Sequence, residues 1–175
     1  MAGLMAMAVL IEMILAPWQA VNDGVMGGIS AGRMVESEDG LRFEGELSLE
    51  NNGGFASVRR VVEADLSETG GVLLKLRGDG RTYQFRLRQN GRFDGIAWRA
   101  EFSTSGEWET VELNFGQFQP VFRGRQVPEA GPVVASRIRQ LGFMLADGQP
   151  GPFALELQSI EFVENDDLPE KRNEK

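Results

Sequence analysis

From residue 41 onward, apolar and polar residues alternate with a period of two along most of the chain. Successive side chains of a β-strand point to opposite faces, so this alternation predicts strands with one face in a core. The alternation is carried by residues 41–50, 55–62, 72–77, 82–88, 96–102, 109–115, 141–145 and 153–162. With a further strand expected around residues 9–15, about nine or ten strands without helical crossovers predict an all-β, antiparallel jelly-roll β-sandwich.

Two irregularities interrupt this pattern. Within residues 153–162 the apolar positions change from odd to even numbers, which predicts a bulge or a break near Gln158 and Ser159. Residues 116–132 lose the alternation and are rich in Gly and Pro, so they are expected to form a long loop.

The length of 175 residues suits one domain with a single core and is too short for two ordinary ones. We expect residues 9–163 to form this domain, with residues 1–8 as a loose extension and residues 164–175 as a disordered acidic tail. The apolar N-terminal segment has no positively charged start and is interrupted by Glu12, so no secretion signal or stable membrane insertion is expected. Met13 is an alternative natural start.

The chain contains neither His nor Cys, which excludes several classes of chemistry. Imidazole acid–base pairs, cysteine nucleophiles, His/Cys zinc sites and disulfides all require these residues. We therefore expect no enzyme activity and no cofactor, and the lack of disulfides favours a reducing, cytoplasmic compartment. The net charge of −8 argues against binding to nucleic acid or to anionic membranes.

A glycine-rich stretch, WQAVNDGVMGGIS, occupies residues 18–30. Its glycines do not have the spacing of phosphate-binding loops, so an architectural role is expected. The stretch also contains apolar residues at irregular positions, which predicts that it packs under or beside the turn at 51–54 and does not project into solvent. The structural glycines in these two segments are expected to be Gly24, Gly27, Gly28, Gly53 and Gly54.

Both turns follow a predicted strand, and they would form one polar cluster if they lie at the same end of the sandwich. Its members would be Asn22, Asp23, Glu50, Asn51 and Asn52. Together with Asp147, these oxygen atoms are suitable calcium ligands, but the spacing has no EF-hand pattern and no metal site is expected. A glycosidase pair of Asp23 and Glu50 would need a cleft that nothing in the sequence indicates.

Three tryptophans are candidates for stacking on sugar rings. Trp98 shares its parity with the apolar residues of its strand and is expected in the core, whereas Trp108 shares the polar face. Trp108 is therefore the best candidate for an exposed ring, although a ring that caps the edge of a sandwich is the favoured role. Trp18 belongs to the glycine-rich stretch and is kept among the candidate binding residues.

Arg86, Arg88 and Arg99 are expected on the outward faces of neighbouring strands. They form either a solvated face paired with Glu101, Glu109 and Glu112 or a docking patch for an acidic partner. RNA is the weaker choice of partner, because no aromatic residues alternate with these arginines on the same face.

Four segments in a fixed order resemble one known family. They are WQAVNDGVMGGIS (18–30), LENNGGFASVR (49–59), RGR (123–125) and LGFMLADGQPGPFALEL (141–157), and the family is that of complex I intermediate-associated protein 30. Arg59 and Arg125 lie in these segments and join the candidate binding residues. The resemblance covers nearly the whole chain.

The resemblance implies a galactose-binding-like fold and a non-catalytic protein that helps to assemble respiratory NADH:ubiquinone oxidoreductase by binding its subunits or assembly intermediates. The resemblance carries over no catalytic residues. No Arg-rich transit segment precedes the domain, which implies a stand-alone bacterial-type or cytosolic member. Because carbohydrate-binding modules share the fold, a carbohydrate-binding β-sandwich is the alternative function.

Overall fold

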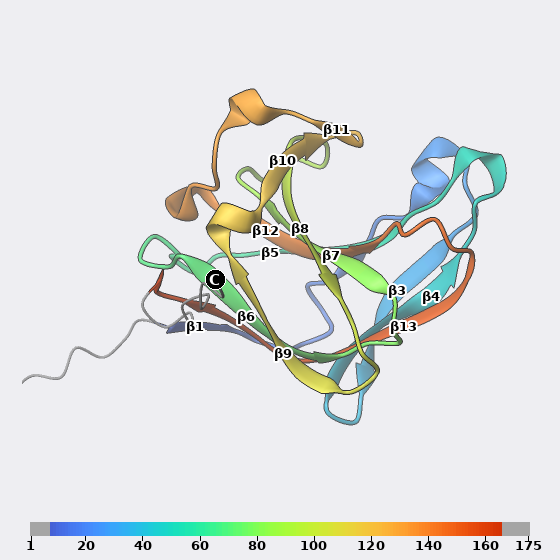
Figure 1. Ribbon diagram of the computed structural model, residues 1–175, viewed down its shortest axis with the longest axis horizontal. Coiled ribbons are helices and arrows are strands. Elements are labelled where there is room, and N and C mark those ends of the chain that lie inside the picture. The colour runs from blue at the N-terminus through green and yellow to red at the C-terminus, as the bar shows by residue number, and fades with distance from the viewer. Residues whose placement is uncertain (1–7, 166–175) are drawn as a thin grey trace, which may run out of the picture.

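Two antiparallel β-sheets pack face to face in the computed structural model, which describes residues 8–165 (Figure 1). The first sheet has the order β3-β4-β13-β6-β9, and β1 pairs with β13 beside this path. Its strands are β1 (Ala8–Ile11), β3 (Ala31–Ser37), β4 (Gly40–Leu47), β6 (Gly71–Arg77), β9 (Trp108–Asn114) and β13 (Gly151–Val163). This arrangement confirms the predicted all-β sandwich.

The second sheet has seven strands in the order β11-β10-β8-β7-β12-β5-β2. Its strands are β2 (Gln19–Ala20), β5 (Ala56–Val61), β7 (Thr82–Arg88), β8 (Ala97–Ser103), β10 (Gln119–Phe122), β11 (Arg125–Gln126) and β12 (Gln140–Leu145). Five short 3₁₀ helices lie in the connections of the described chain: η1 (Asp23–Met26), η2 (Glu50–Asn52), η3 (Phe115–Gln117), η4 (Pro128–Ala130) and η5 (Ala135–Arg137).

The core lies between the two sheets and is filled by the apolar side chains on the inward face of each strand. Phe85 of β7 packs against Phe143 of β12 with ring centroids 5.2 Å apart, and Phe43 of β4 packs against Phe153 of β13 at 4.9 Å. Tyr83 is also fully buried, and burial raises the pKa of its hydroxyl. Aromatic pairs at these separations stabilise the core beyond the effect of the area that the rings bury. The inward-facing side chains therefore decide how the two sheets pack.

The parity change in the last strand is a β-bulge. β13 runs unbroken from Gly151 to Val163, but its register against β6 shifts between Leu157 and Ser159. The bulge lets odd-numbered and even-numbered apolar residues face the same core, which confirms the prediction made from the sequence.

The sequence pattern missed several strands. β3 was not expected, since glycine and charged residues leave Met34 as its single buried large side chain. The predicted loop at 116–132 contains β10 and β11, and the first strand ends at Ile11, well before residue 15. Such short strands form because the neighbouring strand offers hydrogen-bond partners, a reason that local alternation does not reveal.

The predicted domain of residues 9–163 falls wholly within the described residues 8–165. Most of the expected N-terminal extension and residues 166–175 of the expected tail lie outside the described residues, so those expectations stay predictions. Across residues 8–165, no helix has the length and apolar character needed to span a membrane.

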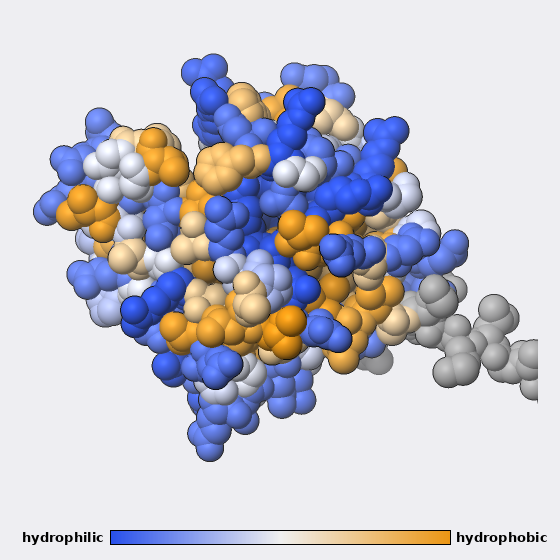
Figure 2. All heavy atoms as spheres, turned by 180° about the vertical axis from the view of Figure 1, so that it is seen from behind, coloured by the Kyte–Doolittle hydropathy of each residue, from blue (hydrophilic) through white to orange (hydrophobic). Residues whose placement is uncertain are grey.

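Two arms extend beyond the sandwich: one connects strands of the two sheets, and the other belongs to the seven-stranded sheet (Figure 1). One arm contains η1 and η2, and the other contains β10 and β11. Seen from behind, the surface is indented between the two arms (Figure 2). The outward face of β5, β7, β8 and β12 lies between the arms and holds the candidate site.

Candidate functional site

Asp23 is the centre of the arm that contains η1 and η2. Its side chain has an exposed fraction of 0 %, and its carboxylate accepts hydrogen bonds from the Ser30 backbone N–H at 2.9 Å and the Ser30 hydroxyl at 2.5 Å. The Gly54 N–H donates a further bond at 2.8 Å, and the Asp23 N–H donates to the Phe55 carbonyl at 3.1 Å. These bonds join residues 22–30 to the turn at 51–54, as predicted.

These hydrogen bonds keep Asp23 ionised although it is buried. Burial by itself raises the pKa of its carboxyl, but the bonds from Ser30, Gly54 and Phe55 outweigh burial and hold the pKa below its ordinary value. A Cβ added at Gly28 would lie 2.4 Å from Cγ of Asp23, and one at Gly53 would lie 2.5 Å from Oδ2. Both glycines therefore make room for the buried carboxylate.

At the other three predicted glycines of this arm, an added Cβ would not meet Asp23, and backbone conformation decides whether glycine is required there. Gly27 has a φ of 88° and Gly54 a φ of 146°, conformations that suit glycine. At Gly24 an added Cβ would meet nothing within 4 Å, and no positive φ is recorded there. Geometry therefore requires glycine at four of the five predicted positions.

The expectation that the apolar side chains of this loop are buried is confirmed for Val21 and wrong for the other three. Val25, Met26 and Ile29 have exposed fractions of 64 %, 65 % and 57 %. Val21, Asp23 and Ser30 are the buried residues that fix the loop, whereas Val25 and Met26 of η1 are exposed. Figure 2 shows hydrophobic atoms on the surface of this arm.

The structure brings together only part of the predicted polar cluster. The Asn22 side chain donates to the Gly32 carbonyl and accepts from the Ser57 N–H, so it is a structural residue like Asp23. On η2, the exposed residues Asn51 and Asn52 have φ angles of 57° and 58°, and Glu50 is also exposed. No group of three or more Asp or Glu side chains that could hold a metal ion lies in residues 8–165.

Asp147 belongs to a different part of the surface. It forms a two-point ion pair with Arg81, at 2.7 Å and 2.8 Å, and this guanidinium also donates to the carbonyls of Gln149 and Pro152. The hydrogen bonds from Arg81 hold the pKa of Asp147 below its ordinary value. Every charge in this group has an opposite charge beside it.

The tryptophans do not lie together on one binding face. Trp98 is buried, as predicted, and its Nε1 donates to the Gly131 carbonyl at 3.0 Å. Trp108 begins β9 at the edge of the six-stranded sheet, where the guanidinium of Arg77 lies 4.9 Å from its ring centroid. Trp18 is half-buried against Phe143, with ring centroids 6.2 Å apart.

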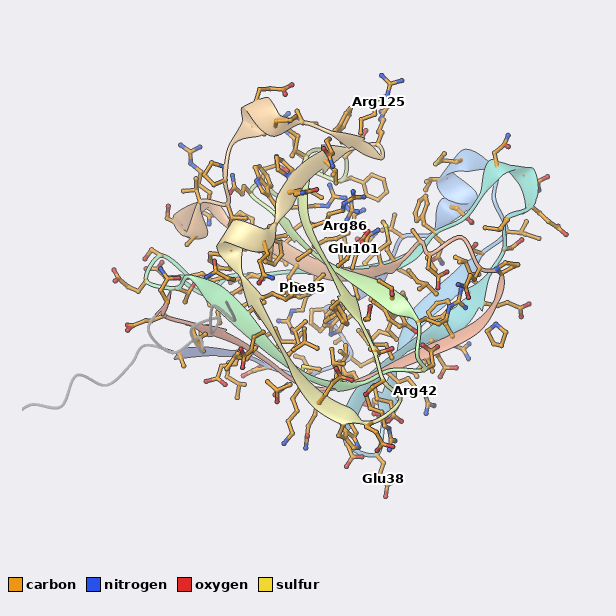
Figure 3. All side chains as sticks on the ribbon, in the orientation of Figure 1. Glu38, Arg42, Phe85, Arg86, Glu101 and Arg125 are labelled. Atoms are coloured by element: carbon orange, nitrogen blue, oxygen red, sulfur yellow. The ribbon has the colours of Figure 1, made fainter. Side chains whose placement is uncertain are left out.

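Arginine side chains line the outward face of the seven-stranded sheet. Arg99 of β8 pairs in register with Arg86 of β7, and Arg86 pairs with Gly142 of β12. Gly142 in turn pairs with Arg59 of β5. These residues form a line across four strands, which we call the arginine row: Arg99, Arg86, Gly142 and Arg59. Figure 3 shows Arg86 and Glu101 on this outward side and Phe85 toward the core.

Neutral groups hold these arginines in place. Arg59 donates to the Phe93 carbonyl at 2.7 Å, and its guanidinium lies 5.0 Å from the Phe93 ring centroid. Arg86 donates to the Gln84 amide oxygen at 2.8 Å. Arg88 lies two residues further along β7 on the same face and donates to the Gly95 carbonyl at 2.9 Å. Each guanidinium has five N–H donors, so these bonds fix its position and leave donors free.

The arginines of this face form no ion pair in the described chain, and the charge of Asp94 acts on Arg59 and Arg88 only from a longer distance. All ion pairs found in residues 8–165 involve other arginines, namely Arg33, Arg42, Arg77, Arg81 and Arg123. Burial and the neighbouring charges of Arg88, Arg99 and Arg59 lower the pKa of Arg86 to about 10. Burial and Arg88 lower that of Arg59 to about 10 as well.

The suggested pairing with glutamates is not seen among the described residues. Glu109 and Glu112 lie on β9 in the opposite sheet, and Glu101 on the arginine face forms no ion pair with Arg86, Arg88 or Arg99. The predicted patch of three arginines therefore gains Arg59, which the sequence had grouped with the polar turns. The alternation along β5 could have identified Arg59 from the sequence. Ser57 and Arg59 stand on either side of the buried Val58, so they share the outward face of the strand.

Arg125 is separate from this row, since β11 carries it at the exposed tip of the other arm (Figure 3). Beyond Glu101 the same sheet face continues into a pocket of about 340 Å³. Polar residues line most of this pocket: Arg81, Thr82, Gln84, Glu101, Asp147 and Gln149.

Residues 12–157 match the family described as complex I intermediate-associated protein 30. The mitochondrial protein of that name from Mus musculus is 28 % identical over 169 residues, covering 83 % of this chain and 52 % of the mouse protein. The Drosophila melanogaster protein is 30 % identical over 112 residues, covering 59 % of this chain and 38 % of its own length. The chain thus spans about half or less of the length of these two relatives.

Solved structures with the same fold include carbohydrate-binding modules. A family 11 module from Clostridium thermocellum, solved in complex with a β-1,3-1,4-mixed-linked tetrasaccharide, superposes with a TM-score of 0.66 at 17 % identity. The match covers 90 % of this chain and 95 % of that module. A family 30 module of a cellulosomal cellulase from the same organism gives 0.60 at 11 % identity, covering 91 % and 99 % of the two chains. At these identities the likeness establishes the galactose-binding-like sandwich fold.

Proposed function

We propose, from the premise that the chain belongs to the complex I intermediate-associated protein 30 family, that it is a non-enzymatic protein-binding module. In this function it helps to assemble or stabilise a multi-subunit complex, and respiratory complex I or a relative is the candidate. The names of the mouse and fly relatives support this choice.

One observation carries the proposal on the side of geometry: the arginines of this face lie close together and form no ion pair in the described chain. A fold gains little stability from placing like charges on neighbouring strands, because they repel one another. Arginine is enriched at protein interfaces, where its planar group binds carboxylates through two hydrogen bonds. We therefore assign docking of a protein partner to the face that carries Arg86, Arg88 and Arg99.

The test is affinity capture with the whole chain from its native host. Recovery of complex I subunits or assembly intermediates, together with less assembled complex I in a deletion strain, is the expected result. Capture of no such subunit, with normal complex I in the deletion strain, would overturn the proposed function.

Carbohydrate binding is the second candidate, and the polar pocket beside Glu101 favours it. Its volume of about 340 Å³ is in the range of small-molecule sites. The tryptophan favoured from the sequence, Trp108, lies on the opposite sheet and does not contribute a ring to this pocket. A glycan array tests this function. Binding that is lost when Gln84 is substituted supports it, and the absence of binding to every glycan on the array would exclude it.

A further inference from the structure

Gly142 leaves a hollow in the middle of the arginine row. An added Cβ at this position would lie 2.4 Å from the Val58 carbonyl oxygen and 3.2 Å from Cα of Arg59. Only glycine fits between β5 and β7 at this level without moving the backbone. The hollow has a volume of about 20 Å³, and Arg59, Arg86, Arg88, Gln140 and Met144 are among the residues that line it.

The size of the hollow restricts what enters it. About 20 Å³ is enough for a water-sized group and far too small for a sugar ring. A carboxylate oxygen has the right size, and guanidinium groups on either side offer the charge that it prefers. The outward residues of the four strands around the hollow include no aromatic ring, and the nearby Phe93 ring already packs against the guanidinium of Arg59.

The length of the row suits an extended polypeptide. Neighbouring strands lie about 4.8 Å apart, so the three strand spacings from Arg99 to Arg59 cover about 14 Å. In an extended segment, side chains on one face repeat about every 6.7 Å, so three of them span about 13 Å. Carboxylates at every second position of such a segment would therefore match the row.

We propose that the hollow over Gly142 is a carboxylate-binding site, which takes an Asp or Glu side chain from an extended acidic segment of a protein partner. The carboxylate lies between Arg59 and Arg86, and the next same-face acidic residue on the β8 side of it reaches Arg99. This inference rests on the proposed function and names the chemistry of its partner.

The charge of the whole protein does not prevent this binding. The net charge is −8, but at 0.15 M salt the screening length is about 8 Å, so an acidic segment in contact with the row feels mainly the nearest arginines. The neutral groups that hold Arg59, Arg86 and Arg88 fix these side chains before a ligand arrives. Less conformational freedom is then lost on binding.

The test measures binding of a labelled ten-residue peptide of alternating Glu and Ser by fluorescence anisotropy at 0.15 M salt. The same peptide with Gln in place of Glu is the reference ligand. We expect the Glu peptide to bind at least tenfold more tightly than the Gln peptide. Arg86→Gln and Arg59→Gln should each weaken it by about tenfold, the loss expected for a charge-assisted hydrogen-bonded pair.

Arg137→Gln is the matched control, because Arg137 is an exposed arginine of η5 outside the row and forms no ion pair in the described chain. It should change the affinity by less than twofold. Arg86→Lys keeps the charge but loses the planar group, so it should recover part of the affinity lost in Arg86→Gln. Melting curves establish that every variant is folded.

Several results would overturn the inference. These are equal binding of the Glu and Gln peptides, equal weakening by Arg137→Gln and Arg86→Gln, or tighter, Arg86-dependent binding of oligogalacturonate, which would assign the site to an acidic glycan. Displacement of the Glu peptide by inorganic phosphate at equal concentration would assign it to phosphate. Capture of complex I subunits by the Arg86→Gln variant as well as by the unchanged chain would overturn the site and leave the proposed function intact.

Discussion

Asp23 and the arginine row are both sets of charge removed from bulk water, but they are balanced in opposite ways. The carboxylate of Asp23 is fully buried and accepts hydrogen bonds from Ser30 and Gly54 within its own arm. Arg59 and Arg86 contact neutral acceptors and one another's charges.

This difference separates architecture from binding. A charge whose hydrogen bonds are completed within the fold stabilises the fold, and removing it should cost stability. Like charges that lie close together and form no ion pair contribute little stability and are suited to a ligand that brings the opposite charge. Asp23, the most conspicuous acidic residue of the sequence motif, therefore belongs to the scaffold, whereas the row belongs to the surface that we propose for docking.

The sharpest test of this comparison is Asp23→Ala. It leaves the N–H groups of Ser30 and Gly54 without their acceptor, and the Ser30 hydroxyl keeps only the Ser48 carbonyl, so we expect a loss on the order of 3–5 kcal/mol in the free energy of unfolding. Urea unfolding at pH 7 measures it. Asp39→Ala, at an exposed turn, is the control and should stay within about 0.5 kcal/mol. A loss below about 1 kcal/mol for Asp23→Ala would remove its architectural role.

The glycines around Asp23 give the next largest effect. Gly28→Ala places a Cβ 2.4 Å from Cγ of Asp23, and we expect about 1–3 kcal/mol of destabilisation from the overlap. Gly27→Val should also lower the melting temperature, because a β-branched residue is strained at a φ of 88°. Gly24→Ala is the control, since an added Cβ there meets nothing within 4 Å. Equal melting temperatures for the Gly24 and Gly28 variants would contradict this account.

The third prediction concerns pH. The pKa of Asp23 is lower in the folded protein than in the unfolded chain, so its stabilising effect is present above the unfolded pKa of about 3.9 and is lost as the pH falls through the folded pKa. Asp147 beside Arg81 acts in the same direction. The urea midpoint should therefore fall as the pH is lowered from about 5 to about 3. Asp23→Asn should flatten this dependence, and an unchanged slope would argue against an ionised Asp23.

The smallest effect on stability is expected at the row itself. Arg86→Gln removes a charge that burial and three neighbouring arginines disfavour, so the free energy of unfolding should rise or stay within about 0.5 kcal/mol. Thermal unfolding of this variant next to Arg81→Gln makes the comparison direct, because Arg81 is fully paired with Asp147 and its loss should be clearly destabilising. Destabilisation of similar size in both variants would show that Arg86 serves the fold.

Part of the candidate site could be predicted from the sequence. The outward parity of Arg86, Arg88 and Arg99 follows from the buried residues between them, and the structure places all three on one sheet face. Arg59 was assigned to the wrong group, because its place in the chain is next to the turn at 51–54. Its neighbour in space is decided by the pairing of β5 with β12, which brings together residues more than 80 positions apart.

The glycine-rich stretch at residues 18–30 shows a second limit of prediction from the sequence. Its apolar residues indicated burial, but Val21 is the only one of the four that is buried. The polar Asp23 is fully buried, whereas Val25, Met26 and Ile29 are exposed. A sequence pattern counts how apolar a segment is. Whether a carboxylate can be buried depends on donors supplied from elsewhere in the chain, here Ser30 and Gly54.

By itself, the sequence determined the all-β class, the inward face of most strands and the bulge near Gln158 and Ser159. All three depend on side-chain periodicity, which is a local property of a strand. Only the tertiary structure decided which strands are neighbours, and therefore that Arg99, Arg86, Gly142 and Arg59 form one row with a hollow at its centre. Strand order follows from how two whole sheets bury their faces together, and no local spacing records it.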